Sequence, residues 1–150
     1  MEELVIDQSL VANQDLKKFD KCIRNQYSDS VVNYFYGNAG REHYKLMSYI
    51  SYKYNNSLLL DIGTYRGLSA LSLSSNPSNN VITFDIVNLV IENKKYHSPR
   101  NNSNTIFIID NILDNKEKYF DMLRKSKVIM LDVDPHDGIK EPLFLKIIEE

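Results

Sequence analysis

Aspartates stand at or near the ends of four short apolar segments of this 150-residue chain, and their side chains are the ones best suited to chemistry. They are Asp61, Asp85, Asp110 and Asp132. A carboxylate accepts hydrogen bonds from hydroxyls, takes up protons or ligates cations. If the four segments are parallel strands of one sheet, their carboxyl ends open onto one crevice, where open α/β sheets bind ligands. We therefore expect these aspartates to mark a ligand site.

A glycine loop follows the first of these segments. The apolar run 58–62 contains Asp61 and leads into Gly63 and Gly67. This order predicts a buried parallel strand, a tight turn and a helix start, where backbone can approach a nucleotide-like ligand closely. The spacing is Gly-x-x-x-Gly and not Gly-x-Gly-x-x-Gly, which argues against a pyrophosphate cradle. A plain strand-to-helix turn is the alternative.

The second and third segments end in polar residues with two interpretations each. Asp85 lies about 20 residues past the glycine turn, where an acid accepts hydrogen bonds from both ribose hydroxyls. Its alternative is a solvated strand-end aspartate. Asp110 and Asn111 follow the third segment. They either contact a bound base or form an Asx turn that caps the next helix.

The fourth segment ends in a dense polar cluster. Three carboxylates and an imidazole fall within six residues, contributed by Asp132, Asp134, His136 and Asp137. Their expected place at a parallel strand's carboxyl end favours a ligand site. The alternative is a surface turn rich in Asp and Gly.

The glycine loop also carries a family resemblance. The pattern Asp-x-Gly-x-x-x-Gly-x-Ser-Ala, residues 61–70, resembles the first motif of the class I S-adenosylmethionine-dependent methyltransferases. The resemblance implies methyl transfer from S-adenosylmethionine to an oxygen or nitrogen of a small-molecule acceptor. It also implies these cofactor-binding residues: Asp61, Gly63, Tyr65, Gly67, Ser69, Asp85, Asp110, Asn111 and Asp132.

The fourth cluster resembles the fourth motif of small-molecule O-methyltransferases, notably the cation-dependent catechol and caffeoyl-coenzyme A type. In that group Asp-x-Asp holds a divalent cation, which implies Asp134 as a catalytic residue and a ligand of Mg²⁺ or Ca²⁺. Such a metal would orient the acceptor hydroxyl and make it more acidic. Alternatively, His136 deprotonates the acceptor directly as a general base.

The wider pattern predicts an α/β fold. Apolar runs alternate with helical patterns, giving strands at 58–62, 81–86, 105–109 and 127–131 and helices at 66–74, 112–126 and from 141 onward. The polar segment 92–104 is ambiguous, and we interpret it as a short helix that runs into an exposed loop. Such alternation predicts a doubly wound, Rossmann-like parallel sheet. The family's strand order is 3-2-1-4.

Helical patterning precedes this core. Helices are expected at 9–24 and 41–54, so residues 1–56 form an N-terminal helical cap and residues 57–150 the cofactor-binding core of one domain. The family's sheet has further strands beside the fourth, and they supply further metal ligands. The fourth strand would otherwise be an unprotected edge. We therefore expect a truncated form of a longer protein, with a homo-oligomer or another partner covering that edge as the alternative.

Composition narrows the function further. A net charge of −2 and no basic cluster give no reason to expect a nucleic-acid partner. A single cysteine favours a reducing, cytoplasmic location, and no membrane span or secretory signal is visible. Two other functions stay open: a non-catalytic remnant of the fold that binds cofactor or is merely structural and, more weakly, a nicotinamide-dependent dehydrogenase.

Overall fold

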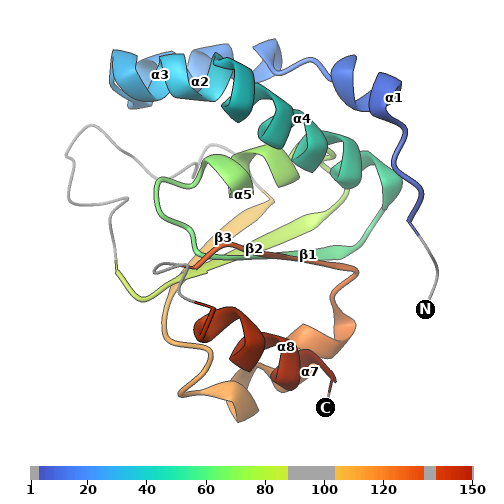
Figure 1. The fold of residues 1–150 in the computed structure, drawn as a ribbon, viewed down its shortest axis with the longest axis vertical. Helices are drawn as coiled ribbons and strands as arrows, with labels where there is room; N and C mark the ends of the chain where they lie inside the picture. The colour runs from blue at the N-terminus through green and yellow to red at the C-terminus, as the bar shows by residue number, and fades with distance from the viewer. Residues whose placement is uncertain (1–3, 88–103, 134–137, 150) are drawn as a thin grey trace.

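The structure is a computed structural model that describes residues 4–87, 104–133 and 138–149. Its centre is a four-stranded parallel sheet in the order β3-β2-β1-β4, which is the order expected from the family resemblance. The strands are β1 (Leu58–Ile62), β2 (Asn80–Asp85), β3 (Thr105–Ile109) and β4 (Val128–Leu131). Helices cover both faces of the sheet, which confirms the α/β fold (Figure 1).

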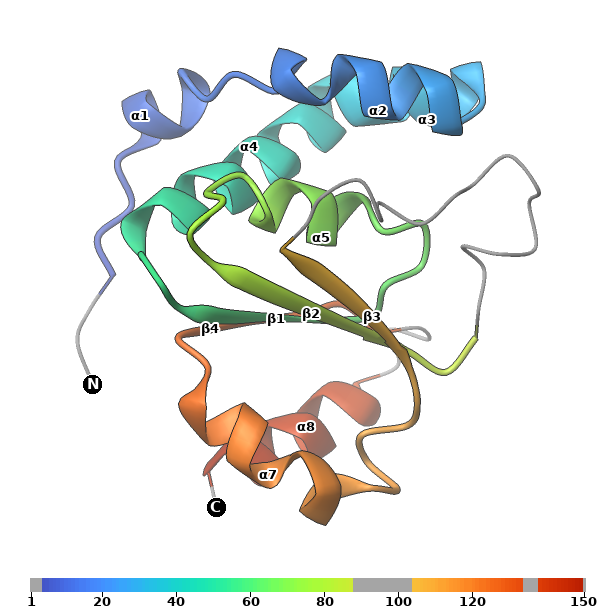
Figure 2. The same cartoon turned by 180° about the vertical axis from the view of Figure 1, so that it is seen from behind.

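The two faces of the sheet carry different helices. Figure 2 shows α4 (Asn38–Lys53) and α5 (Leu68–Leu73) on one side, and α7 (Lys116–Lys125) and α8 (Lys140–Glu149) on the other. Side chains alternate accordingly along β1. Leu59 packs toward α4 and α5, whereas Leu60 and Ile62 pack in the cluster that includes α7 and α8. The sheet is therefore buried on both faces, as parallel sheets are.

The N-terminal region is helical but more broken than the sequence suggests. Instead of one helix at 9–24 the structure has α1 (Gln8–Ala12), a 3₁₀ turn (Lys17–Phe19) and α2 (Asp20–Gln26). A further helix, α3 (Asp29–Tyr36), was not expected. The single-helix prediction is wrong because aspartate side chains bind nearby backbone amides. Asp7 caps Ser9 N, and Asp15 Oδ1 accepts from Lys17 N at 2.8 Å, so each starts a new turn.

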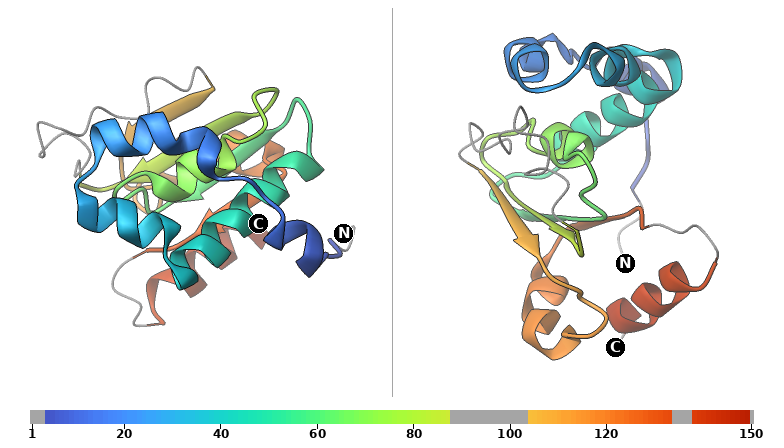
Figure 3. Two further views of the ribbon diagram at one scale, coloured as in Figure 1. Left: turned by 90° about the horizontal axis from the view of Figure 1, so that it is seen from above. Right: turned by 90° about the vertical axis from the view of Figure 1, so that its left-hand side faces the viewer.

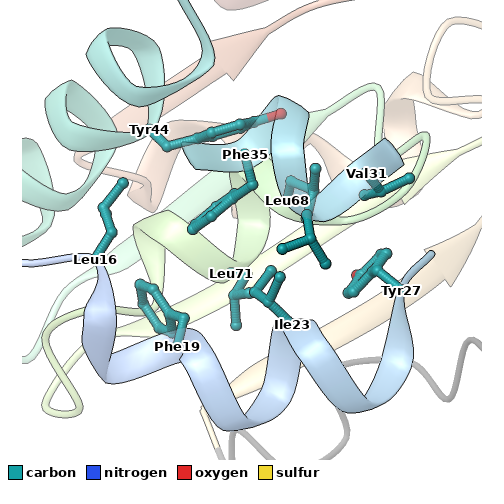
Figure 4. Close-up of a cluster of buried hydrophobic side chains, with 10 residues drawn as sticks. Leu16, Phe19, Ile23, Tyr27, Val31, Phe35, Tyr44, Leu68 and Leu71 are labelled. Carbon is teal, nitrogen blue, oxygen red and sulfur yellow. The ribbon is translucent and has the colours of Figure 1, made fainter. Parts of the chain in front are cut away.

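These N-terminal helices form an outer layer over α5. Figure 3 shows them stacked beyond α5, away from the sheet. Their shared core contains Phe19, Ile23 and Phe35, which pack with Leu68 and Leu71 of α5 (Figure 4). The helical layer thus rests on the helix that follows the glycine loop.

The expected elements otherwise agree with the structure to within a few residues. The segment 92–104 lies almost wholly outside the described residues. In the part of the chain that the structure describes, no helix is long and apolar enough to cross a membrane. Among the described strands, β4 pairs with β1 alone and β3 with β2 alone. That further strands of a longer protein, or a partner, cover the free edge of β4 stays a prediction.

Candidate functional site

The glycine loop needs its first glycine for two reasons. Gly63 has φ of +108°, a conformation that side-chain-bearing residues rarely adopt. A Cβ built on Gly63 would lie 1.7 Å from the carbonyl oxygen of Asp132. The loop after β1 therefore touches the backbone after β4, and only glycine allows this contact.

The amides of the glycine loop already have partners within the protein. Gly63 N and Thr64 N both donate to Phe84 O, at 2.9 and 3.0 Å. Tyr65 N donates to Asp85 Oδ2 at 2.7 Å, and Gly67 N donates to Thr64 O at 2.6 Å. A phosphate-binding loop presents free amides to its ligand. This loop instead uses these four donors to attach itself to the end of β2 and to close its own turn.

Tyr65 is the residue of this loop that faces outward. Its φ is +45°, an uncommon conformation for a residue with a bulky side chain, and the side chain is 54% exposed. The guanidinium of Arg66 lies 4.9 Å from the centre of the Tyr65 ring. Non-glycine residues held at positive φ cluster at functional sites. Tyr65 is thus fixed by its backbone while its ring stays accessible.

Asp85 joins the glycine loop to the chain beyond β2. Its Oδ2 accepts from Tyr65 N, and its Oδ1 accepts from Val87 N at 3.0 Å. Each carboxylate oxygen has two lone pairs, so among the described residues one lone pair on each oxygen is left for a ligand. The carboxylate is consequently oriented by backbone donors and still able to bind hydroxyl groups.

Asp61 lies in a different environment, with no exposed surface at all. Its Oδ2 accepts from Thr83 Oγ1 at 2.7 Å and from Ser69 Oγ at 3.1 Å, while Oδ1 has no hydrogen-bond partner among the described residues. Burial raises the pKa of Asp61 to about 7. The two hydroxyls oppose the shift, and Asp132 and Asp85 add to it. Asp61 is therefore a buried carboxyl able to gain or lose its proton near neutral pH.

Asp110, after β3, is held by charge. Its carboxylate accepts from Lys118 Nζ at 2.7 Å, from the Tyr119 hydroxyl and from Asn115 Nδ2 at 2.8 Å. The hydrogen bonds from Lys118 and Tyr119 lower the pKa of Asp110 to about 2. Asn111 N also donates to Asp110 Oδ1 at 2.9 Å. These contacts are those of a structural anchor for the start of α7.

A cavity of about 240 Å³ opens at the carboxyl end of the sheet. Its polar lining includes Asp85, Asp110, Asp132 and Lys140. Its apolar walls come from four places: β1 and β2 with the residues that follow β2, the segment after β3, the segment after β4, and α8. These apolar residues are Ile62, Phe84, Ile86, Val87, Ile112, Leu113, Val133 and Phe144. The cavity thus combines apolar walls with a few charged groups, as ligand sites do.

The structure brings most of the described candidate residues to this cavity. Its lining contains Gly63, Tyr65, Asp85, Asp110, Asn111 and Asp132. Gly67, with φ of +76°, instead forms the N-cap of α5, and Ser69 and Asp61 bond to each other beside the loop. The candidate catalytic residues Asp134 and His136 lie outside the described residues, as does Asp137. Their roles stay predictions.

The expected metal also stays a prediction. Among the residues that the structure describes, no group of three or more His, Cys, Asp or Glu side chains is arranged to hold a metal ion. Asp132 is exposed beside the cavity, but the proposed ligand Asp134 is not described. No step of the chemistry below is therefore built on a metal.

Sequence reasoning missed two parts of the site. Thr83, the buried donor to Asp61, lies directly opposite it in the β1–β2 register, so a polar residue inside an apolar strand was the available signal. Lys140 and Phe144 reach the cavity from α8. No spacing in the sequence predicts that these two side chains reach the cavity, because their position depends on how α8 packs against the sheet.

The fold and site together define an open parallel α/β domain with a cavity at the carboxyl edge of its sheet. Comparison of the chain with protein-family models, with curated proteins and with solved structures finds no match in any of the three. The residues and geometry of the chain itself are therefore the basis for proposing a function.

Proposed function

We propose that the protein transfers a methyl group from S-adenosylmethionine to an oxygen or nitrogen of a small-molecule acceptor. The observation that carries the proposal is the carboxylate of Asp85 at the wall of an apolar cavity, oriented by Tyr65 N and Val87 N. A carboxylate at the end of the second strand is placed to accept hydrogen bonds from both ribose hydroxyls.

The apolar walls suit the base of the same nucleoside. Ile86 follows Asp85 directly, and Ile112 and Leu113 approach from the segment after β3. A flat purine buries its faces well between aliphatic side chains. The volume of about 240 Å³ is below the roughly 300–1,000 Å³ of drug-sized ligand sites, so it fits a nucleoside better than a dinucleotide.

The glycine loop supports a ligand without phosphates. The amides of Gly63, Thr64, Tyr65 and Gly67 are all bonded within the protein, so they are not offered to a pyrophosphate. This counts against the nicotinamide dinucleotide alternative. S-adenosylmethionine has no phosphate and carries a positive sulfonium, which the carboxylates Asp85 and Asp132 at the cavity favour.

In this reaction the protein positions the acceptor and removes its proton. S-adenosylmethionine supplies the activated methyl group when bound. The protein must align the acceptor atom with that group and take its proton. We propose Asp134 or His136 for the proton transfer, because both follow β4 directly and β4 neighbours β1.

Calorimetric titration tests the cofactor assignment. We expect S-adenosylhomocysteine to bind and NAD not to bind. Asp85→Ala should weaken S-adenosylhomocysteine binding at least tenfold, because charge-assisted hydrogen bonds are worth about 1.5 to 3 kcal/mol each. Asp85→Asn keeps one oxygen for Tyr65 N and should lose less. Asp121→Ala, an exposed aspartate on α7, is the matched control and should bind like the parent. Unchanged affinity in Asp85→Ala would show that Asp85 does not bind the cofactor and is only a solvated strand-end aspartate.

Turnover separates the enzyme from a non-catalytic remnant. A protein that binds S-adenosylhomocysteine yet transfers no methyl group to any of a panel of phenolic and amine acceptors would favour the remnant. With an active acceptor, Asp134→Asn should abolish methyl transfer and leave cofactor affinity nearly intact, since only the acceptor side is altered. An Asp134→Asn variant as active as the parent would remove Asp134 from the mechanism.

A further inference from the structure

The buried carboxyl of Asp61 is not explained by cofactor contact alone. It has no exposed surface and does not line the cavity. Its two described hydrogen-bond donors are neutral hydroxyls, from Thr83 on β2 and Ser69 on α5. Its Oδ1 is buried without a hydrogen-bond partner among the described residues. A permanent charge in such a place is costly, since buried charges are normally paired.

The charged groups around Asp61 come from several elements. Asp85 at the end of β2 and Asp132 after β4 both act on it electrostatically, and both line the cavity. Tyr44 on α4 also interacts electrostatically with Asp61. Its pKa is raised, first by burial and then by Tyr34 and Asp132, so it stays a neutral hydroxyl. The helix α5 has the sequence LSALSL and contributes no titratable group. The cavity also contains one lysine side chain, Lys140, among the described lining residues.

We infer that Asp61 couples the charge of the cavity's ligand to its own protonation, so that the site binds a cationic sulfonium ligand with release of a proton and the neutral sulfide product without it. The inference rests on the proposed function. A cation beside Asp85 and Asp132 offsets the repulsion that these carboxylates exert on Asp61. The ionised form of Asp61 then becomes favourable, and its proton leaves to solvent. Once the methyl group has been transferred, the sulfide carries no charge, and Asp61 takes a proton back.

The coupling makes Asp61 a residue that distinguishes substrate from product. The two cofactor forms differ by one methyl group and one charge, so shape alone discriminates weakly between them. A charge-sensitive carboxyl outside the cavity adds discrimination without direct contact. Because the pKa of unliganded Asp61 is about 7, the effect should be largest between about pH 6 and 8.

Calorimetry of S-adenosylmethionine and S-adenosylhomocysteine at pH 6, 7 and 8, each in two buffers of different ionisation enthalpy, tests the inference. We expect S-adenosylmethionine to release more protons on binding than S-adenosylhomocysteine. If the sulfonium lowers the pKa of Asp61 by one unit, the affinity ratio of the two ligands should rise about fivefold from pH 6 to pH 8. Asp61→Asn, which resembles the protonated carboxyl, should remove the difference in proton release.

The outcomes separate the two proposals. If both ligands bind with the same pH dependence and the same proton release, the coupling is wrong and the proposed function stands. Extra proton release that persists in Asp61→Asn also overturns it, because another group would then be responsible. If neither ligand binds the parent protein, the proposed function fails and the coupling falls with it. Should Asp61→Asn fail to fold, the ¹³C carboxyl resonances of the parent decide: a buried aspartate must titrate near pH 7 and shift downward with the sulfonium ligand only.

Discussion

Asp61 and Asp110 lie at the carboxyl ends of β1 and β3 in the same sheet, yet their surroundings give them opposite acid strengths. Asp61 is buried among hydroxyls, and its pKa rises to about 7. Asp110 is partly exposed and bonded to the Lys118 ammonium, and its pKa falls to about 2. Both are strand-end aspartates of a parallel sheet. The difference shows that the partners of a strand-end acid, and not its position, decide whether it can change charge.

The two regions therefore serve different ends. Around Asp110, hydrogen bonds from Asn111, Asn115 and Lys118 hold the start of α7 in one geometry at every pH above about 4. Around Asp61, the glycine loop, β2 and α5 meet at a carboxyl group that is partly protonated near neutral pH, because its pKa is about 7. In the sheet order, Asp85 thus lies between Asp110, whose charge is fixed, and Asp61, whose charge can change.

The largest effect is expected at the glycine loop. Gly63→Ala places a Cβ against the Asp132 carbonyl and forces an unfavourable φ, so we expect a loss of more than about 3 kcal/mol in the free energy of unfolding. Urea denaturation measures it. Gly138→Ala is the control and should lose only about 1 kcal/mol, because Gly138 has positive φ but no described residue lies within 4 Å of its built Cβ. Equal losses in the two variants would mean that the contact with Asp132 is unimportant.

The next effect is a pH dependence at Asp61. Its folded-state pKa lies above the ordinary 3.8, so the folded protein holds this proton more tightly than the unfolded chain. Stability from this group is full below about pH 4 and is lost as the pH rises to about 7. Asp61→Asn should consequently raise the free energy of unfolding at pH 8 by roughly 2 to 4 kcal/mol relative to its effect at pH 4. Urea titrations at pH 4, 6 and 8 measure this, and a pH-independent difference would contradict the assignment.

A smaller effect is expected where the helical layer meets the glycine loop. The hydroxyl of Tyr27 donates to Arg66 O at 2.7 Å, so Tyr27→Phe leaves that carbonyl without this donor. We expect a loss of about 1 kcal/mol. Tyr34→Phe, at a side chain that is 61% exposed, is the control and should change little. Thermal unfolding compares them. A Tyr27→Phe variant as stable as the control would show that the helical layer does not brace the loop.

The smallest effect belongs to Asp110. Its pKa is depressed, so its contribution to stability is present above about pH 4 and is lost as the pH falls toward about 2. Asp110→Asn should lower the melting temperature slightly at pH 7 in low salt, and less in high salt, because Lys118 is mostly exposed and its ion pair is screened. A salt-independent loss would indicate that the neutral hydrogen bonds, and not the ion pair, hold the start of α7.

Local sequence patterns were enough to predict the strands of the sheet, whereas their order was expected from the family resemblance. The bounds of β1 and β3 agree with the expected ranges because each is a short apolar run between polar turns. The helical layer was less predictable. Asp15 interrupts the expected helix at 9–24 through a hydrogen bond from Lys17 N, and Asp7 caps the short α1 before it. Periodicity does not reveal such bonds. The third helix, α3, was missed altogether.

The site divides in the same way. The positions of the glycine loop and of Asp85 were predictable, because glycine turns and strand ends are visible in short stretches of sequence. Thr83, Lys140 and Phe144 were not, because their places depend on strand register and on how α8 packs against the sheet. The acid strengths of Asp61 and Asp110 were equally out of reach, since burial and ion pairing arise only in the folded chain.

The contact between Gly63 and Asp132 has a consequence for how the protein folds. It joins the loop after β1 to the segment after β4, with β2, β3 and α7 between them along the chain. Contacts between such distant segments carry a large loop-closure entropy and form late. We expect the helical layer and the β1–β2 pair to form first during synthesis. The cavity edge would be completed only when β4 emerges, so the nascent chain would acquire its ligand site as one of its last folding events.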